Sequence, residues 1–293
     1  MKLEDLNKLN HLKGRLRISG IGWTKDVNQA ERAQLNSKDS LVALELEFRG
    51  TDRRRYSRDP SYLLLEGLQP HPNLKHLEIS FYYGTNVFPH WMSSLTSLKR
   101  LVLRSCSKCQ SLGPFGKLLN LESLSLQDMF GVKKVDQKFL GVEDTWKTKK
   151  DSTISLFPKL KRLEFRELRK WNAWESYASL NSSLNIMPHL VSLEIIGCSA
   201  LKPPLPEFLL GTPLEKLSIR SCRLLEQHFQ EGLGTKDVVK ILTSSTLDFV
   251  DADIARAMHM VESETCKDDP QTSGHGEISQ VDEDEKAAEE NNV

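Results

Sequence analysis

Three copies of one nine-residue pattern, LxxLxLxxC, decide how this chain folds: LKRLVLRSC at Leu98–Cys106, LVSLEIIGC at Leu190–Cys198 and LEKLSIRSC at Leu214–Cys222. The last two apolar residues of LxxLxL are two positions apart, and such residues point to the same face of a β-strand. Parallel stacking of these strands would bury that face continuously. The cysteine follows the strand, so we expect its side chain to turn inward and pack.

Weaker copies of the pattern begin at Leu41, Leu74, Leu121 and Leu160, and a further strand is expected at Leu16–Ile18. The shorter spacings between copies, 23 and 24 residues, fall within the period of about 20–29 residues that is typical of leucine-rich repeats. The pattern therefore predicts an α/β solenoid over residues 1–250. We expect a horseshoe with a parallel sheet on its concave face and short helices or turns on its convex face. The longer spacings predict polar, basic loop insertions near residues 50–60 and 143–155.

Several segments outside the strands have their own predictions. Helical periodicity and capping residues predict helices at Asp26–Lys38 and Leu224–Leu233. The return segment Val87–Met92 predicts a short helix or an irregular turn. Residues 251–261 carry an apolar stripe that predicts a helical cap, and the acidic composition of residues 262–293 predicts a disordered tail.

The charge of the chain is unevenly distributed. Lysine plus arginine and aspartate plus glutamate both number 40, but residues 262–293 hold 11 acidic and 2 basic residues, which leaves residues 1–261 with a net charge of +9. A basic body favours acidic partners, although surface charge often serves only solubility. The N-terminus has no signal-peptide core and no run approaches about 18 apolar residues. We therefore expect a cytoplasmic protein, with the nucleus as the alternative, and no membrane partner.

Candidate chemistry is sparse. Cys106 and Cys109 form a CxxC, which could be half of a zinc site or a redox pair. No second pair stands at a matching distance and Cys106 already occupies a repeat position, so we interpret both as packing residues. Trp171 and Trp174 could form a ligand platform, but we favour a role in covering a repeat edge. The eight histidines form no cluster, and we expect no enzymatic activity, no metal and no cofactor.

The positions between the leucines define the candidate binding surface. Aligned repeats give three columns: His76, Arg100, Ser123, Arg162, Ser192 and Lys216; Glu45, Glu78, Val102, Ser125, Glu164, Glu194 and Ser218; Glu47, Ser80, Arg104, Gln127, Arg166, Ile196 and Arg220. We expect Arg162, Glu164 and Arg166 to form a local charge lattice that neutralises the middle column and leaves basic margins. The predicted partner-binding residues are His76, Glu78, Arg100, Arg104, Arg162, Glu164, Arg166, Glu194, Lys216 and Arg220. The alternative is a solvated sheet face with no partner.

Three longer strings carry a family resemblance: HPNLKHLEISFYYGTNVFPHWMSSLTSLKRLVLRSCSKC at His71–Cys109, SLGPFGKLLNLESLSLQDMFGVKKVDQKFLG at Ser111–Gly141, and FPKLKRLEFRELRKWNAWE at Phe157–Glu175. They resemble the leucine-rich-repeat region of plant disease-resistance proteins of the coiled-coil, nucleotide-binding class. The resemblance covers residues 1–250 and leaves the acidic tail unmatched.

That resemblance implies a non-catalytic recognition module of plant defence. Its partners would be a pathogen effector, a monitored host protein or a nucleotide-binding switch domain, with nucleic acid disfavoured. The GxxxxGK[ST] loop of such a switch is absent from this sequence, so we expect that contact in trans, and we expect a fragment, a truncated gene product or a decayed copy. The alternative is a general interaction scaffold or a ubiquitin-ligase substrate adaptor, although residues 1–40 contain no F-box-like helical segment.

Overall fold

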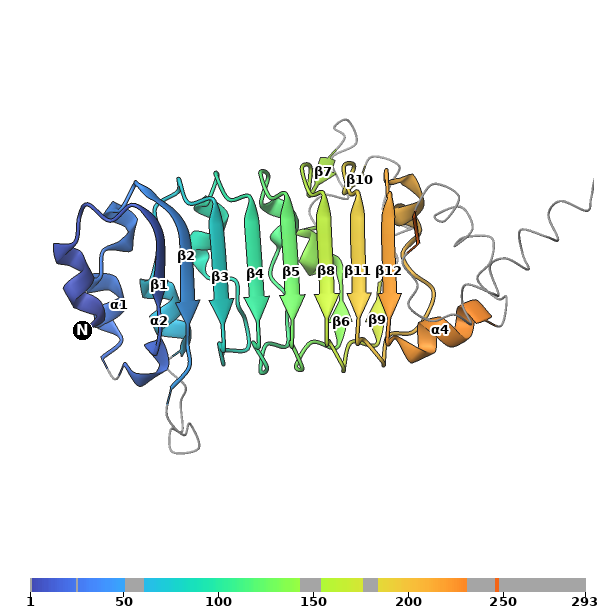
Figure 1. The fold of residues 1–293 in the computed structure, drawn as a ribbon, viewed down its shortest axis with the longest axis horizontal. Helices are drawn as coiled ribbons and strands as arrows, with labels where there is room; N and C mark the ends of the chain where they lie inside the picture. Colours follow the sequence, from blue (N-terminus) through green and yellow to red (C-terminus); the bar gives the residue numbers. More distant parts are fainter. Residues whose placement is uncertain are drawn as a thin grey trace, which may run out of the picture.

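The computed structural model describes residues 2–24, 26–50, 61–142, 154–175, 184–230 and 246–247. Its main feature is a parallel sheet whose strands follow one another in chain order (Figure 1). The strands are β1 (Gly14–Ile18), β2 (Leu41–Glu47), β3 (His76–Ser80), β4 (Arg100–Arg104), β5 (Ser123–Gln127), β8 (Arg162–Arg166), β11 (Ser192–Ile196), β12 (Lys216–Arg220) and β13 (Thr246–Leu247). The predicted solenoid is therefore confirmed, including the strand at Leu16–Ile18.

The leucine pattern determines the register of the sheet. Leu101 of β4 pairs with Leu77 of β3 and Leu124 of β5, and Leu103 pairs likewise with Ile79 and Leu126. These inward side chains are at most 1% exposed and belong to one continuous hydrophobic core. Each repeat thus buries its apolar residues against its two neighbours, as expected of a solenoid.

From β3 onward, the residue that follows each of the strands β3, β4, β5, β8, β11 and β12 has a left-handed backbone. Positive φ angles occur at Phe81, Ser105, Asp128, Glu167, Gly197 and Ser221. At this turn the Ser105 N–H donates to the Gln127 carbonyl at 2.9 Å, and the Glu167 N–H donates to the Ile196 carbonyl at 2.8 Å. The reversal points the next side chain into the core, and Cys106 is fully buried there. The inward packing predicted for the repeat cysteines is confirmed.

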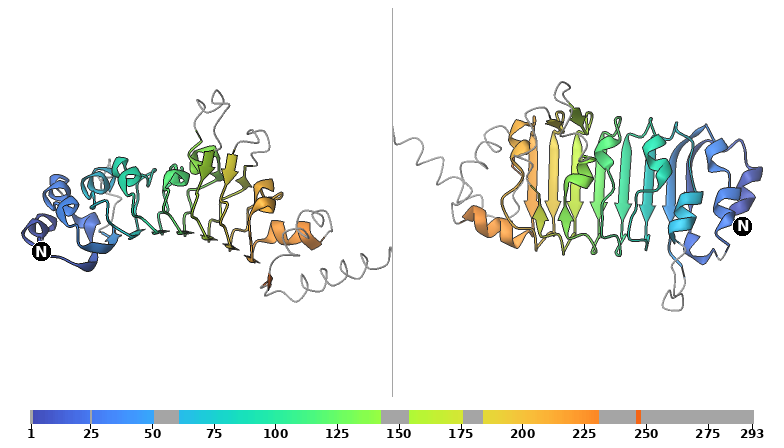
Figure 2. Two further views of the ribbon diagram at one scale, coloured as in Figure 1. Left: turned by 90° about the horizontal axis from the view of Figure 1, so that it is seen from above. Right: turned by 180° about the vertical axis from the view of Figure 1, so that it is seen from behind.

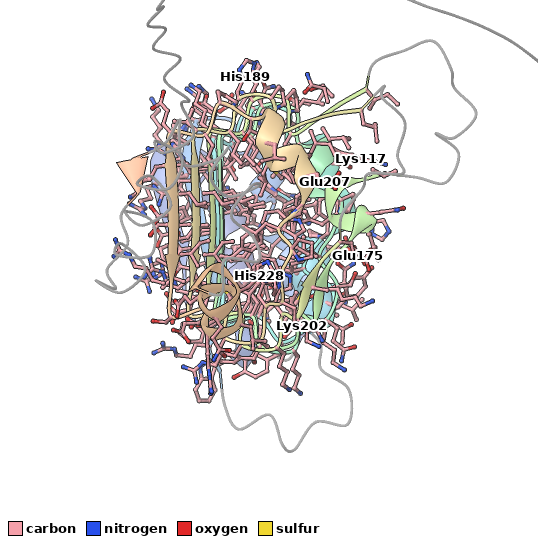
Figure 3. The ribbon with its side chains drawn as sticks, turned by 90° about the vertical axis from the view of Figure 1, so that its right-hand side faces the viewer. Lys117, Glu175, His189, Lys202, Glu207 and His228 are labelled. Atoms are coloured by element: carbon pink, nitrogen blue, oxygen red, sulfur yellow. The ribbon has the colours of Figure 1, made fainter. Side chains whose placement is uncertain are left out.

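The return segments lie on the other face of the sheet (Figure 2). The segments before, between and after the strands contain the α-helices α1 (Asn28–Arg32), α2 (Ser61–Gly67), α3 (Gln137–Leu140) and α4 (Arg223–Gln230), and the 3-10 helices η1 (Leu3–Lys8), η2 (Ile21–Trp23), η3 (Leu35–Ser37), η5 (His90–Ser94), η6 (Phe115–Lys117) and η8 (Glu207–Gly211). Of these, α4 lies at the C-terminal end of the sheet (Figure 1). For Val87–Met92 we expected a short helix or an irregular turn, and the 3-10 helix η5 overlaps this segment from His90 to Met92. In the end-on view, Lys117 and Glu175 lie on the side away from the sheet (Figure 3).

The helix predicted at Asp26–Lys38 was too long. The helix α1 ends at Arg32, and Gln34 adopts a left-handed conformation with φ of 48°. That turn lets Leu35, 2% exposed, pack into the core before the chain enters β2. Burial of Leu35 therefore outweighs continuation of the helix. The helix predicted at Leu224–Leu233 matches α4 as far as Gln230, and its last residues lie outside the described ranges.

The convex side also contains strands, which the prediction of helices or turns missed. Strands β7 (Ile154–Leu156) and β10 (Leu184–Ile186) form one small parallel sheet. Strands β6 (Lys134–Val135) and β9 (Ala173–Trp174) form another. The sequence could have predicted the first pair of strands, because the strings ISLFP and LNIMP share an alternating apolar pattern that ends in proline. Adjacent repeats with equivalent return segments can pair on both faces of the solenoid.

Several predicted features lie outside the described residues. They are most of the basic loop near residues 50–60, nearly all of the loop at 143–155, the helical cap at 251–261 and the acidic tail at 262–293. Among the helices that the structure describes, none has the length and apolar character needed to cross a membrane.

Candidate functional site

The outward positions of β1 to β12 form what we call the exposed sheet face. Strand pairing places His76, Arg100 and Ser123 side by side in the first column, and the second and third columns run parallel to it. The same register continues through β8, β11 and β12. The sheet therefore assembles all ten predicted residues on one face, in the order read from the repeats.

The structure adds two arginines that the columns omitted. Arg15 of β1 aligns with the first column, and Arg17 aligns with Glu45 in the second. Both arginine side chains are well exposed, at 72% and 63%. Their signal was present in the sequence, because the strand around Leu16 was recognised and its flanking residues must point outward.

Positive charge at the N-terminal end of this face is offset by carboxylates. Arg15 is ion-paired with Glu45, and Arg17 lies 3.0 Å from a carboxylate oxygen of Glu47. Arg49 approaches the same carboxylate at 3.3 Å. Burial acts to raise the pKa of Glu47, but hydrogen bonds from Ser19 and Arg17 and the adjacent positive charges lower it overall. This end of the face is therefore occupied by its own ion pairs.

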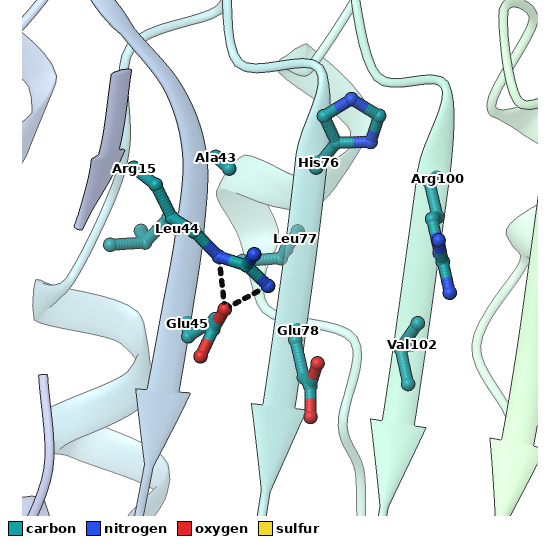
Figure 4. Close-up of a pocket in the computed structure, with 9 residues that line it drawn as sticks. All are labelled: Arg15, Ala43, Leu44, Glu45, His76, Leu77, Glu78, Arg100 and Val102. Atoms are coloured by element: carbon teal, nitrogen blue, oxygen red, sulfur yellow. Dashed lines mark hydrogen bonds and ion pairs between the residues drawn. The ribbon is translucent and has the colours of Figure 1, made fainter. Parts of the chain in front are cut away.

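A shallow hollow of about 260 Å³ lies beside these ion pairs (Figure 4). It is lined by Arg15 and Glu45 together with His76, Glu78 and Arg100. Partial burial, followed by the positive charges of Arg100 and Arg15, lowers the pKa of His76. Since the ordinary value is 6.5, this imidazole is neutral at pH 7 and contributes a hydrogen-bonding group rather than a charge.

The middle of the face holds one carboxylate, Glu164, in a network of donors. The Ser125 hydroxyl donates to it at 2.7 Å, the Gln127 amide at 3.3 Å and the Arg166 Nε at 2.8 Å. Burial acts to raise the pKa of Glu164, but these bonds lower it overall. The predicted lattice was wrong about Arg162, for which no ion pair with Glu164 is found among the described residues. The guanidinium and two neutral donors hold this carboxylate instead.

Four arginines surround this network, and we call Arg100, Arg104, Arg162 and Arg166 the four-arginine frame. All four are exposed, while Ser125 between them is 7% exposed. Two strand spacings of about 4.8 Å and four residues of about 3.3 Å give a frame of roughly 10 by 13 Å between backbones. Over the ranges that the structure describes, Arg166 is the one member with a carboxylate partner. With Glu164 counted, the frame has a net charge of +3.

The C-terminal end of the face carries less charge. Lys216 lies 3.1 Å from a carboxylate oxygen of Glu194. Within the described residues, the buried Nε of Arg220 has no hydrogen-bond partner, and Ile196 is the apolar member of its column. Among the column arginines, those without a carboxylate partner within the described ranges are Arg100, Arg104 and Arg162 on β4 and β8, and Arg220 alone on β12.

The four cysteines that the structure describes, Cys106, Cys109, Cys198 and Cys222, are buried packing residues. The Cys106 thiol donates to the Ile79 carbonyl at 3.8 Å, and the Cys109 thiol donates to the Ser111 carbonyl at 3.3 Å. Burial raises the pKa of Cys109 to about 11, which suppresses the reactive thiolate. Within the described ranges, no group of three or more potential ligands is arranged to hold a metal ion.

The two tryptophans also belong to the core. Trp171 is fully buried and Trp174 is 4% exposed. Their rings pack against Phe165 at centroid distances of 4.6 and 5.2 Å. A ligand platform needs an exposed ring face, so the structure does not support that alternative. Both rings instead fill the space between the sheet and the convex strands.

One parallel strand per repeat, a left-handed turn after it and a leucine-lined core define a leucine-rich-repeat protein. Residues 3–129 match the family model described as R13L1/DRL21 LRRs. The chain is 31% identical over 234 residues to the putative disease resistance RPP13-like protein 1 of Arabidopsis thaliana, covering 77% of this chain and 21% of the relative. It is 34% identical over 207 residues to the putative disease resistance protein RGA4 of Solanum bulbocastanum, covering 66% and 20%. The predicted relation to the leucine-rich-repeat regions of plant disease-resistance proteins is confirmed.

The chain spans about a fifth of the length of these curated relatives. Among solved structures, it is similar to the leucine-rich repeat domain of the type III effector XCV3220 (XopL), with 20% identity and a TM-score of 0.37 over 75% of this chain and 73% of that one. The assignment of the fold rests on the strand register and not on that likeness.

Proposed function

We propose that this chain is a non-catalytic recognition module of plant defence that binds an acidic protein surface through the four-arginine frame. The similarity to disease-resistance proteins supports the biological setting. The observation that carries the proposal is that Arg100, Arg104 and Arg162 on β4 and β8 are exposed and, within the described residues, have no carboxylate partner. Arginine suits this role because its planar guanidinium binds carboxylates in a bidentate manner.

The partner would be a pathogen effector, a monitored host protein or a nucleotide-binding switch domain that contacts the chain in trans. Each candidate would need an acidic patch that can cover a frame of about 10 by 13 Å. Charge complementarity of this kind mainly increases the association rate and the specificity of a protein complex. Binding through the frame should therefore weaken as the salt concentration rises.

A triple substitution tests the role of the frame. Arg100→Glu, Arg104→Glu and Arg162→Glu break no ion pair that the structure describes, so the fold should survive. The full-length protein would be used to capture partners from infected and healthy plant tissue, with identification by mass spectrometry. We expect the native chain to capture a nucleotide-binding receptor or a pathogen protein, and the triple variant to lose it.

A matched control reverses three exposed lysines of the return segments, with the substitutions Lys133→Glu, Lys138→Glu and Lys202→Glu. This control changes the net charge equally and should keep the partner. Equal capture by the frame variant and the native chain would show that the frame is not the binding surface. Capture of ubiquitin-ligase subunits in place of defence proteins would support the adaptor alternative.

A further inference from the structure

The chain contains its own acidic counterpart to the frame. Residues 262–293 carry 11 acidic and 2 basic residues, and the densest run is the tetrapeptide Asp282–Glu285. The remaining residues carry a net charge of +9. The four-arginine frame, counted with Glu164, contributes +3 of this net charge. Opposite charges in one chain meet at a high effective concentration, on the order of millimolar when the connection is flexible.

The sheet order places the frame within reach of that segment. Thr246–Leu247 form β13, which pairs with β12 at the C-terminal end of the sheet. The strand order β5-β8-β11-β12-β13 puts the centre of the frame four spacings away, about 19 Å. The 35 residues from Leu247 to Asp282 can span up to about 115 Å. The connection is therefore long enough to reach the frame.

The frame is also chemically suited to hold carboxylates. It already binds one, because Ser125, Gln127 and Arg166 together hold Glu164. Residues two apart on an extended segment lie about 6.6 Å apart on one side, which equals the separation of the columns along each strand. An extended acidic segment placed along β5 would bring alternate carboxylates opposite successive columns, between the arginines of β4 and β8.

We propose that the acidic segment around Asp282–Glu285 docks on the four-arginine frame and competes with external partners for it. This inference rests on the proposed function in one respect, namely that the frame binds acidic surfaces. The docked segment acts as an internal competitor. A partner must then offer more negative charge or better shape complementarity than the segment in order to displace it.

The test compares the full chain with a tail variant, Glu283→Gln, Asp284→Asn and Glu285→Gln. A matched control removes the same charges elsewhere, with Glu31→Gln, Asp39→Asn and Glu207→Gln, all exposed positions. Two-dimensional amide NMR spectra of the three proteins would be recorded at low ionic strength. We expect the tail variant to shift the amide signals of β4, β5 and β8 relative to the native chain, and the control to leave them unchanged.

A second measurement uses a labelled peptide of sequence EISQVDEDEKAAEE, residues 277–290. Fluorescence anisotropy should show that the tail variant binds it at least about threefold more tightly than the native chain, since the internal competitor is weakened. The frame variant Arg100→Glu, Arg104→Glu and Arg162→Glu should lose this binding. Equal affinities for the native chain and the tail variant, or amide shifts confined to strands outside the frame, would overturn the inference.

These outcomes are separable from the partner-capture experiment. Amide shifts on β4, β5 and β8 need no external protein, so they would uphold docking of the segment even if the frame variant still captured its partner from tissue. Competition with that partner would then be refuted together with the proposed function. Loss of capture in the frame variant without tail-dependent shifts would uphold the proposed function and refute the internal competitor.

Discussion

Replacement of Trp171 by alanine should remove the largest side chain that the repeats bury completely. The ring is 0% exposed and lies 4.6 Å from Phe165 and 5.6 Å from Trp174 between centroids. Its Nε1 donates a hydrogen bond to the Ala173 carbonyl at 2.8 Å. The substitution therefore removes apolar burial, two aromatic contacts and one hydrogen bond together.

The size of the effect follows from the buried area. A buried tryptophan removes about 150–250 Å² from water, and about 25 cal/mol per Å² gives roughly 4–6 kcal/mol as an upper bound. Aromatic-to-alanine substitutions in cores cost about 3–5 kcal/mol. We therefore expect Trp171→Ala to lower the free energy of unfolding by about 4 kcal/mol. Because repeats contact only their neighbours, the loss should be concentrated around β8 and β11.

Urea unfolding followed by circular dichroism measures the total loss, and amide hydrogen exchange locates it. The control is Trp23→Ala, since that side chain is 60% exposed and its loss should cost less than about 1 kcal/mol. A loss below about 1 kcal/mol for Trp171→Ala, or one equal to that of Trp23→Ala, would refute the assignment of Trp171 to the core.

Three further predictions concern the thiols, a close backbone contact and the exposed face. Burial raises the pKa of the Cys109 thiol to about 11. At pH 8 this thiol should therefore react with a disulfide reagent at least about 100-fold more slowly in the native chain than after unfolding. Equal rates in the two states would contradict its burial. Gly116→Ala should lower the free energy of unfolding in urea by about 1–3 kcal/mol, because the added Cβ would overlap the Leu140 carbonyl oxygen. The control Gly211→Ala should change stability little, because open space surrounds that position. Similar effects of the two substitutions would argue against close packing at Gly116. Glu47 has a lowered pKa, so its stabilisation is present above pH 4.5, its ordinary value, and is lost as the pH falls through the lower folded value. Glu47→Gln should consequently lose less stability than the native chain between about pH 5 and 3 in urea unfolding, and equal losses would contradict the cause given for the shift.

Much of the fold could be predicted from the sequence. The LxL spacing identified β4 with Leu101 and Leu103 inward and Arg100 and Arg104 outward, because a strand alternates its faces regardless of its neighbours. Equivalent positions in successive repeats then meet in register, so the three columns followed as well. The surface of the candidate site was therefore predictable before any contact was known.

The charge pairing on that surface was not predictable in the same way. Glu164 accepts hydrogen bonds from Ser125, which lies 39 residues earlier in the chain, whereas the sequence suggested its near neighbour Arg162 as a member of the lattice. Side chains two apart on a strand share a face, but their rotamers decide whether charged ends meet. The position at which α1 ends could not be predicted from the sequence either, because it is determined by the burial of Leu35 in a core built from distant residues.

The sequence by itself determined that this chain is a leucine-rich-repeat solenoid and which residues occupy its exposed face, because both follow from a local alternation repeated along the chain. The tertiary structure alone decided where that face keeps free charge. Glu45 is ion-paired with Arg15, 30 residues away, and this pairing helps to offset positive charge at the N-terminal end. Three arginines between β4 and β8 are left without a described carboxylate partner. Ion pairs depend on distances between side chains of different repeats, which only the assembled sheet establishes.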